Sequence, residues 1–165
     1  MYRRSTRAMD LASLPRPLAE QLAGHAAQHQ IELRDTRVWL THSENPPAEG
    51  FVGRLLGRRA NPVDPNTQSD TALVLHPTHV LVAMNGDKAG AFALSLPLVQ
   101  ASMTRGSALA ARFGAAGGED GITLSGFPGE TGRPGTYFVG LGPEPAGAAC
   151  VQAVEAAILA AKNPR

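Results

Sequence analysis

Residues 71–96 decide the fold, and they read TALVLHPTHVLVAMNGDKAGAFALSL. Two short apolar runs, 71–75 and 80–84, are separated by a His-Pro-Thr-His turn. The turn at 85–90 is rich in residues that readily adopt positive φ, and a third apolar run follows at 91–96. Short β-rich runs joined by such turns predict neighbouring strands. In the third run, large residues share one face and small residues the other: Phe92, Leu94 and Leu96 against Ala91, Ala93 and Ser95.

Further strands are predicted on both sides of this stretch. Residues 31–41, which include the single tryptophan Trp39, have an extended pattern, as do residues 122–125 and 136–141. Residues 98–103 follow Pro97 and are predicted to form an edge strand. Residues 109–113 fit a helix or a strand equally well.

Two helices are expected. Leu18, Leu22 and Ala26 recur at helical spacing within 17–30. Residues 143–162 place an apolar stripe on one side of a second helix, typical of a helix packed on a sheet: Cys150, Val154, Ala157, Ile158 and Ala161. On that stripe Cys150 is expected to be a buried filler and not a nucleophile. Residues 1–14 are expected to form a polar, mobile leader, which leaves 15–165 as one domain.

Composition limits the function classes. The 165 residues are 43% hydrophobic, as in a globular domain, and the net charge of +1 argues against a nucleic-acid binder. A single cysteine fits a reducing compartment. The N-terminal arginine pair precedes no apolar segment of a secretory signal, and no apolar run approaches the roughly 18 residues of a membrane span. We therefore expect a cytoplasmic protein.

Together these elements predict an α+β fold, in which strands between residues 31 and 141 form a small antiparallel β-barrel or strongly bent sheet. The last helix would cap its open end, and an antiparallel sandwich is the closest alternative. Residues 71–88, 121–129 and 136–142 resemble the strands of bacterial pleckstrin-homology-like (PH-like) domain proteins of uncharacterised function. That resemblance implies a barrel closed by the C-terminal helix.

The irregular stretch 43–70 is the predicted interaction surface. It is too long for a simple connector, and it combines apolar residues with the one tight arginine cluster: Phe51, Arg54, Leu55, Arg58 and Arg59. PH-like relatives that bind phosphoinositides use a lysine with spaced basic residues near the first strands. This cluster contains no lysine, so we expect no membrane lipid as its ligand.

The sequence contains no recognisable catalytic or cofactor motif. Nucleophile-elbow, phosphate-loop and dinucleotide spacings are absent, so we expect no catalytic residue and no cofactor. His25 and His29 lie one helical turn apart, and His76 and His79 flank a turn, but a pair of ligands does not complete a metal site. We expect no bound metal. The acidic residues in turns select no catalytic pair: Asp64, Asp70, Asp87, Glu119, Asp120 and Glu130.

The leading interpretation is a non-catalytic binding or scaffolding module that uses surface loops or strand edges, with an unknown protein or a second copy as its partner. The alternative is a small enzyme or metal protein whose histidines and carboxylates converge only in the fold. A third possibility is a regulatory lipid- or anion-binding surface formed by the arginine loop. Two histidines and a carboxylate in a deep pocket would favour the enzyme, whereas an open strand edge would favour the module.

Overall fold

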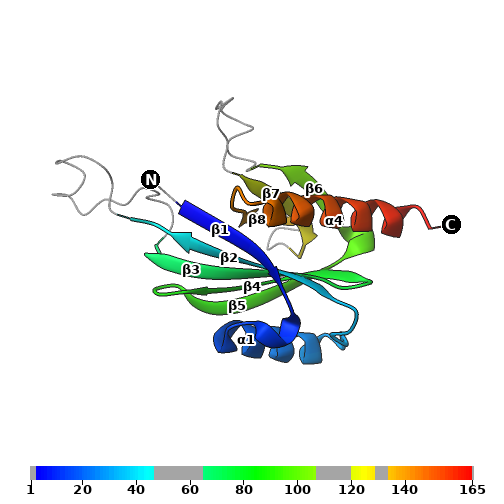
Figure 1. The fold of residues 1–165 in the computed structure, drawn as a ribbon. Coiled ribbons are helices and arrows are strands. Elements are labelled where there is room, and N and C mark those ends of the chain that lie inside the picture. Colours follow the sequence, from blue (N-terminus) through cyan, green and yellow to red (C-terminus); the bar gives the residue numbers. More distant parts are fainter. Residues whose placement is uncertain (1–2, 47–64, 107–119, 129–133, 165) are drawn as a thin grey trace.

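The computed structural model describes residues 3–46, 65–106, 120–128 and 134–164, and they form an α+β fold with two antiparallel sheets (Figure 1). The larger sheet contains five strands in chain order: β1 (Arg3–Met9), β2 (Arg37–Glu44), β3 (Gln68–Leu75), β4 (His79–Gly86) and β5 (Gly90–Pro97). The smaller sheet has the order β6 (Ser102–Arg105), β7 (Gly121–Phe127), β8 (Gly135–Gly140). The helices are α1 (Arg16–Gln28) and α4 (Pro145–Lys162).

The prediction of antiparallel strands with two helices is confirmed, but the closed barrel is wrong. The described strands form two separate sheets, and α4 and the smaller sheet lie on one side of the larger sheet while α1 lies on the other (Figure 1). Both helices end within a few residues of their predicted limits.

Each face of the larger sheet has its own core. Alternation along the strands sends successive side chains to opposite faces. In β4, Val80 and Val82 point toward α4 and the smaller sheet, where Cys150, Val154 and Ile158 pack against them. Leu81 and Ala83 point toward α1, which covers them with Leu18, Leu22 and Ala26.

The N-terminal segment differs from its prediction. Residues 3–9 were expected to lie in a mobile leader, but they form β1, which pairs with β2 along its whole length. Only Thr6 of this strand is buried. The strand therefore carries almost no apolar alternation that sequence analysis could detect.

The connection from β5 to the smaller sheet also differs. Residues 98–100 form a short 3-10 helix, in which the Ala101 N–H bonds to the Leu98 carbonyl at 3.2 Å, while the Leu98 N–H still bonds to the carbonyl of Thr78 at 3.0 Å. The predicted edge strand begins only at Ser102, as β6.

The turn between β4 and β5 is fixed by a buried amide. The Oδ1 of Asn66 accepts hydrogen bonds from the backbone N–H groups of Lys88 (3.1 Å) and Ala89 (2.9 Å). Gly90 closes the turn at φ +77°, a backbone conformation that favours glycine. This turn sets the position at which β5 begins.

Candidate functional site

The outer edge of β5 is an open strand edge. Within the described residues, β5 pairs with β4 alone and ends the five-stranded sheet. The His76 N–H bonds to the carbonyl of His79, so the backbone groups of His79 point toward β3. This direction alternates from one residue of a strand to the next. The backbone groups of Val80, Val82 and Met84 therefore point toward β5 and bond to it.

The same alternation assigns the backbone groups of β5. Phe92, Leu94 and Leu96 lie opposite those β4 residues, so their N–H and C=O groups bond to β4. The backbone groups of Ala91, Ala93 and Ser95 consequently point out of the sheet. Residues 91–95 are all half-buried, as expected for a strand covered on its faces and open along its edge.

The open edge lacks the usual protection against pairing. Natural edge strands are commonly protected by charged side chains, proline or bulges. Residues 89–96 contain no charged residue, and the nearest proline is Pro97 at the end of the strand. The edge thus offers regular hydrogen-bonding groups and no charge to discourage a partner strand.

The opposite edge of the sheet, at β1, is covered. Glu144 Oε2 accepts a hydrogen bond from the Thr6 N–H (2.9 Å), and the Gly142 N–H donates to Thr6 Oγ1 (2.7 Å). The hydrogen bond from Thr6 is the main reason that the pKa of Glu144 lies below its ordinary value. Arg3, Arg4 and Arg7 add three charges to this strand. Of these two edges, the β5 edge is the one that no other described element covers.

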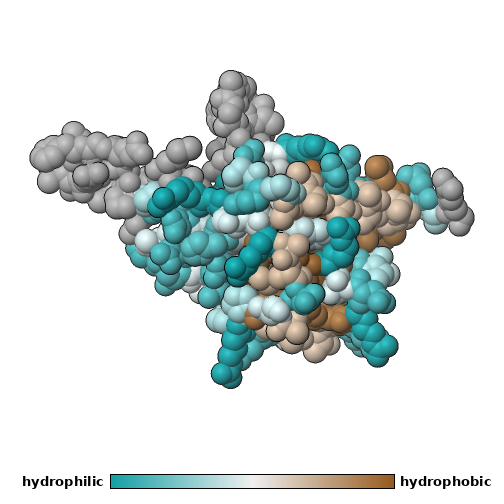
Figure 2. Space-filling view, in the orientation of Figure 1, coloured by the Kyte–Doolittle hydropathy of each residue, from teal (hydrophilic) through white to brown (hydrophobic). Residues whose placement is uncertain are grey.

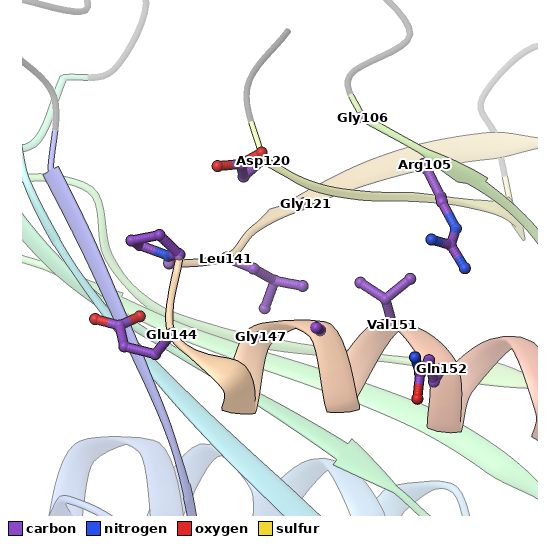
Figure 3. Close-up of a pocket in the computed structure, with 12 residues that line it drawn as sticks. Arg105, Gly106, Asp120, Gly121, Leu141, Glu144, Gly147, Val151 and Gln152 are labelled. Atoms are coloured by element: carbon purple, nitrogen blue, oxygen red, sulfur yellow. The ribbon is translucent and has the colours of Figure 1, made fainter. Parts of the chain in front are cut away.

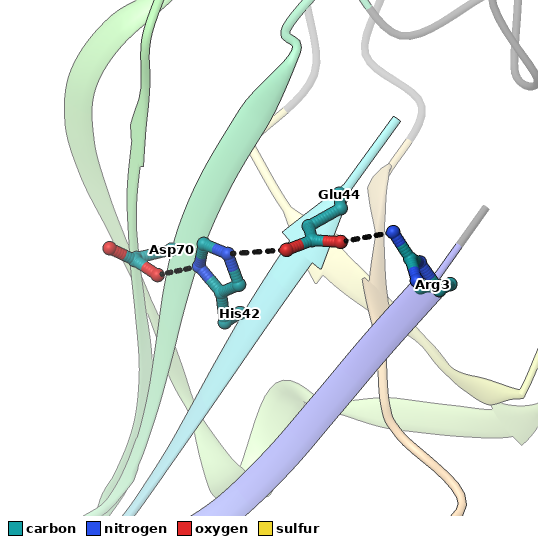
Figure 4. A network of polar contacts seen from close by, with 4 residues as sticks. All are labelled: Arg3, His42, Glu44 and Asp70. Atoms are coloured by element: carbon teal, nitrogen blue, oxygen red, sulfur yellow. Dashed lines mark hydrogen bonds and ion pairs between the residues drawn. The ribbon is translucent and has the colours of Figure 1, made fainter. Parts of the chain in front are cut away.

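A histidine between two carboxylates lies on the polar end of the α1-side face. His42 Nδ1 is 2.7 Å from Asp70, His42 Nε2 is 3.8 Å from Glu44, and Arg3 is 2.9 Å from Glu44 (Figure 4). Ser5 lies opposite His42 on β1, which gives a serine–histidine–aspartate row across three strands. The Ser5 hydroxyl, however, also helps to lower the pKa of Glu144, after the larger effect of the Thr6 N–H.

This network resembles a surface ion-pair network more than a catalytic site. Its side chains are 33–70% exposed on an open sheet surface, and Figure 2 shows hydrophilic residues gathered around the start of β1. Water competes with every contact there. The network therefore adds side-chain contacts between neighbouring strands but does not form a site shielded from solvent.

The other four histidines gather at one end of α1 and the β3–β4 turn. The rings of His25 and His29 have centroids 4.2 Å apart, and those of His76 and His79 are 5.8 Å apart. Partial burial, and then the neighbouring histidines, lower the pKa of His25 and of His79.

Polar neighbours already engage these rings. His25 Nε2 is 2.7 Å from Ser95 Oγ, His76 Nε2 is 2.8 Å from the Glu32 carbonyl, and Thr78 Oγ1 is 2.8 Å from His79 Nδ1. Among residues placed by the structure, no group of three or more His, Cys, Asp or Glu side chains has the geometry of a metal site.

A cavity of about 570 Å³ lies between the first turns of α4 and the ends of β6 and β7 (Figure 3). Two of its three charged lining residues, Arg105 and Glu144 but not Asp120, are engaged by other protein groups. Arg105 lies 3.2 Å from Glu155, and Glu144 bonds to β1. Leu141 and Val151 supply an apolar floor. The cavity contains no histidine and therefore lacks the two-histidine cluster that would favour an enzyme.

The predicted interaction surface, 43–70, is described only at its two ends, which belong in part to β2 (to Glu44) and β3 (from Gln68) and are therefore less irregular than predicted. Phe51, Arg54, Leu55, Arg58 and Arg59 all lie within 47–64, so the structure does not test them. The β5 edge was not singled out in the sequence. Its signal was an uncharged, regularly alternating strand next to a strong turn, but a sequence does not show which strand ends a sheet.

Comparisons with known proteins identify no relative. No protein-family model matches the chain, and neither the curated proteins nor the solved structures contain a significant match. None of the described helices is long and apolar enough to cross a membrane.

Proposed function

We propose that this protein is a non-catalytic binding module that takes up an extended protein segment as a sixth strand along β5. The observation that carries the proposal is the uncharged edge at which Ala91, Ala93 and Ser95 direct their backbone groups outward. An added strand would form main-chain hydrogen bonds there, and pockets beside the strand would select its side chains.

The surfaces on either side of the edge support this function. On the inner face, Phe92 packs edge-to-face on Tyr137 with centroids 5.9 Å apart, and the Tyr137 hydroxyl donates to Met84 Sδ at 3.6 Å. Leu94 is half-buried beside them. A bound segment with apolar residues at alternate positions would extend this cluster, while its other side chains would lie along α1.

Two wider parts of the proposal rest on the fold. We also propose that the chain belongs to a PH-like fold group, on the ground of a run of antiparallel strands followed by a single packed C-terminal helix, although its strands form two sheets and no closed barrel and α1 follows the first strand. The buried single cysteine, Cys150, is compatible with the cytoplasmic location that we propose.

The test uses proline to remove one outward N–H. Ala93→Pro deletes a donor at the middle of the edge, and Ala93→Val adds bulk at the same position but keeps the donor. Peptides with alternating apolar residues should bind wild type and Ala93→Val, and Ala93→Pro should lose at least tenfold in affinity. At concentrations at which the chain is monomeric, equal binding by all three folded proteins, or no binding by any of them, would contradict the addition of a peptide strand at β5.

A further inference from the structure

We infer that the strand added at β5 is β5 of a second copy of this chain, so that the protein forms a two-fold symmetric dimer with a continuous ten-stranded sheet. This inference rests on the proposed strand-edge function and names its partner. It depends on the register of β5 and on the position and surface of α1.

The sequence of β5 is complementary to itself in the antiparallel direction. A two-fold axis through Ala93 pairs Ala93 with its own copy, Ala91 with Ser95, and Phe92 with Leu94. The outward-facing residues then bond in pairs across the axis, because directly opposed residues in an antiparallel ladder exchange both hydrogen bonds. Small residues meet small residues on the α1 side, and large residues meet large residues on the other side.

The position of α1 fits this arrangement. The helix packs against both β4 and β5. Neighbouring strands lie about 4.8 Å apart, and the two-fold axis would lie midway between β5 and its copy. A helix centred above the β4–β5 pair is then about 4.8 Å from that two-fold axis, so the axes of the two symmetry-related helices would be about 10 Å apart. Packed helices in proteins have axes about 8–10 Å apart. The two helices would therefore pack against each other above the joined strands, and neither would block the other.

The contacts of α1 show which residues meet at the axis. His25 lies at the level of Ser95, to which it bonds, and His29 lies near His79, which pairs with Pro97. The helix thus runs in the same direction as β5. One turn before His25, Gln21 lies about 6 Å back along the helix, which is about two strand residues and places it level with Ala93.

The flank of α1 above the open edge is suited to close packing. It contains no charge and includes a glycine: Gln21, Gly24, His25 and Gln28, at positions i, i+3, i+4 and i+7. A side chain built at Gly24 would meet no atom within 4 Å, so this flank is open in the single chain. The charged pair Arg16–Glu20 lies on the opposite flank. Gly24 permits close approach of the two helices, and Gln21 can bond to its own copy.

The experiment measures mass and geometry on the full chain. Sedimentation velocity from micromolar to hundreds of micromolar protein should show a monomer–dimer equilibrium for wild type and Ala93→Val, with Ala93→Pro monomeric throughout. For geometry, a spin label at the exposed turn residue Lys88, introduced as Lys88→Cys, should give one inter-label distance. Gly90, where β5 begins, lies three strand residues from the axis, so the two Gly90 backbones would be about 20 Å apart, and Lys88, at the tip of the turn beyond Gly90, should give a separation of about 25–30 Å.

The outcomes separate the two proposals. A dimer that persists in Ala93→Pro, or a label distance far from this value, would overturn pairing through β5. A monomeric wild type that still binds extended peptides in an Ala93-dependent way would overturn self-association and leave the strand-edge function intact. A monomeric wild type without such binding would remove both.

Discussion

The backbone N–H of Thr6 donates to Oε2 of Glu144 at 2.9 Å, although 138 residues separate them. The contact joins the first strand of the larger sheet to the start of α4. The Thr6 hydroxyl adds to it by accepting from the Gly142 N–H (2.7 Å) and contacting the Thr41 hydroxyl (2.7 Å). This cluster covers the β1 edge. The two edge strands of the larger sheet, β1 and β5, therefore differ in their capacity to pair with an additional strand.

Glu144→Ala should lower the chemical-denaturation midpoint, because the edge N–H of Thr6 loses its acceptor. Glu155→Ala is the matched control, since Glu155 pairs with Arg105 on the surface at 3.2 Å and its loss should have little effect. The pKa of Glu144 is lowered in the folded chain, so its contribution is present above the unfolded-state value and is lost as pH falls through the folded-state value. Equal midpoints for the two variants would show that the contact does not stabilise the fold.

Ile158→Asp and Leu124→Asp should each lower the free energy of unfolding by several kcal/mol, because each introduces an unpaired charge into the core between α4 and the sheets. Ile158 is 6% exposed and Leu124 is fully buried. The neighbouring Leu159 is 57% exposed, so Leu159→Asp should change stability by no more than about 0.5 kcal/mol. If urea unfolding shows that Leu159→Asp lowers the free energy of unfolding as much as the other two substitutions do, the assignment of the buried face of α4 would be contradicted.

Cys150 should react very slowly with thiol reagents in the native protein. Burial raises its pKa to about 12, so only about one thiol in ten thousand is ionised at pH 8. An aromatic disulfide reagent should therefore modify it at a negligible rate until denaturant is added, after which one thiol per chain should appear. Rapid stoichiometric reaction without denaturant would show that the α4 core is open. The result also determines whether Lys88→Cys can be labelled selectively.

Stability should fall as the solution is acidified below about pH 6.5. Partial burial and the neighbouring His29 lower the pKa of His25, which faces Ser95 on β5. A histidine with a lowered folded-state pKa binds fewer protons when folded, so its contribution is full above the unfolded-state pKa and is lost as pH falls toward the folded-state value. Unfolding free energies measured from pH 8 to pH 5 should have a smaller slope in His25→Gln, and an unchanged slope would contradict this assignment.

Sequence analysis predicted the elements whose apolar pattern is strong and missed those held by distant contacts. The alternation in β5 and the stripe on α4 gave the correct faces, because each reflects burial on one side. β1 was missed because Thr6 alone is buried and its partner Glu144 lies near the other end of the chain. One small barrel or strongly bent sheet was predicted where two separate sheets form, because strand number does not show how strands divide between sheets. Likewise, the free edge at β5 depends on strand order, which no local pattern contains.

A substitution on the flank of α1 should affect monomer and dimer in opposite directions. Gly24→Leu removes a helix-interior glycine, which should stabilise the single chain by about 0.5–1 kcal/mol, since a Cβ at this position meets no atom of the described residues within 4 Å. In the dimer, the same side chain would lie between the two α1 helices and weaken association at least tenfold.

Ala23→Leu is the control, because Ala23 is also exposed but lies on the flank that faces away from the β5 edge. It should leave the dimerisation constant unchanged. Thermal unfolding at low concentration measures the monomer, and sedimentation equilibrium measures the dimer. Association that is unchanged in Gly24→Leu would show that α1 does not pack against its copy, since that variant cannot fail through misfolding if its unfolding midpoint rises as expected.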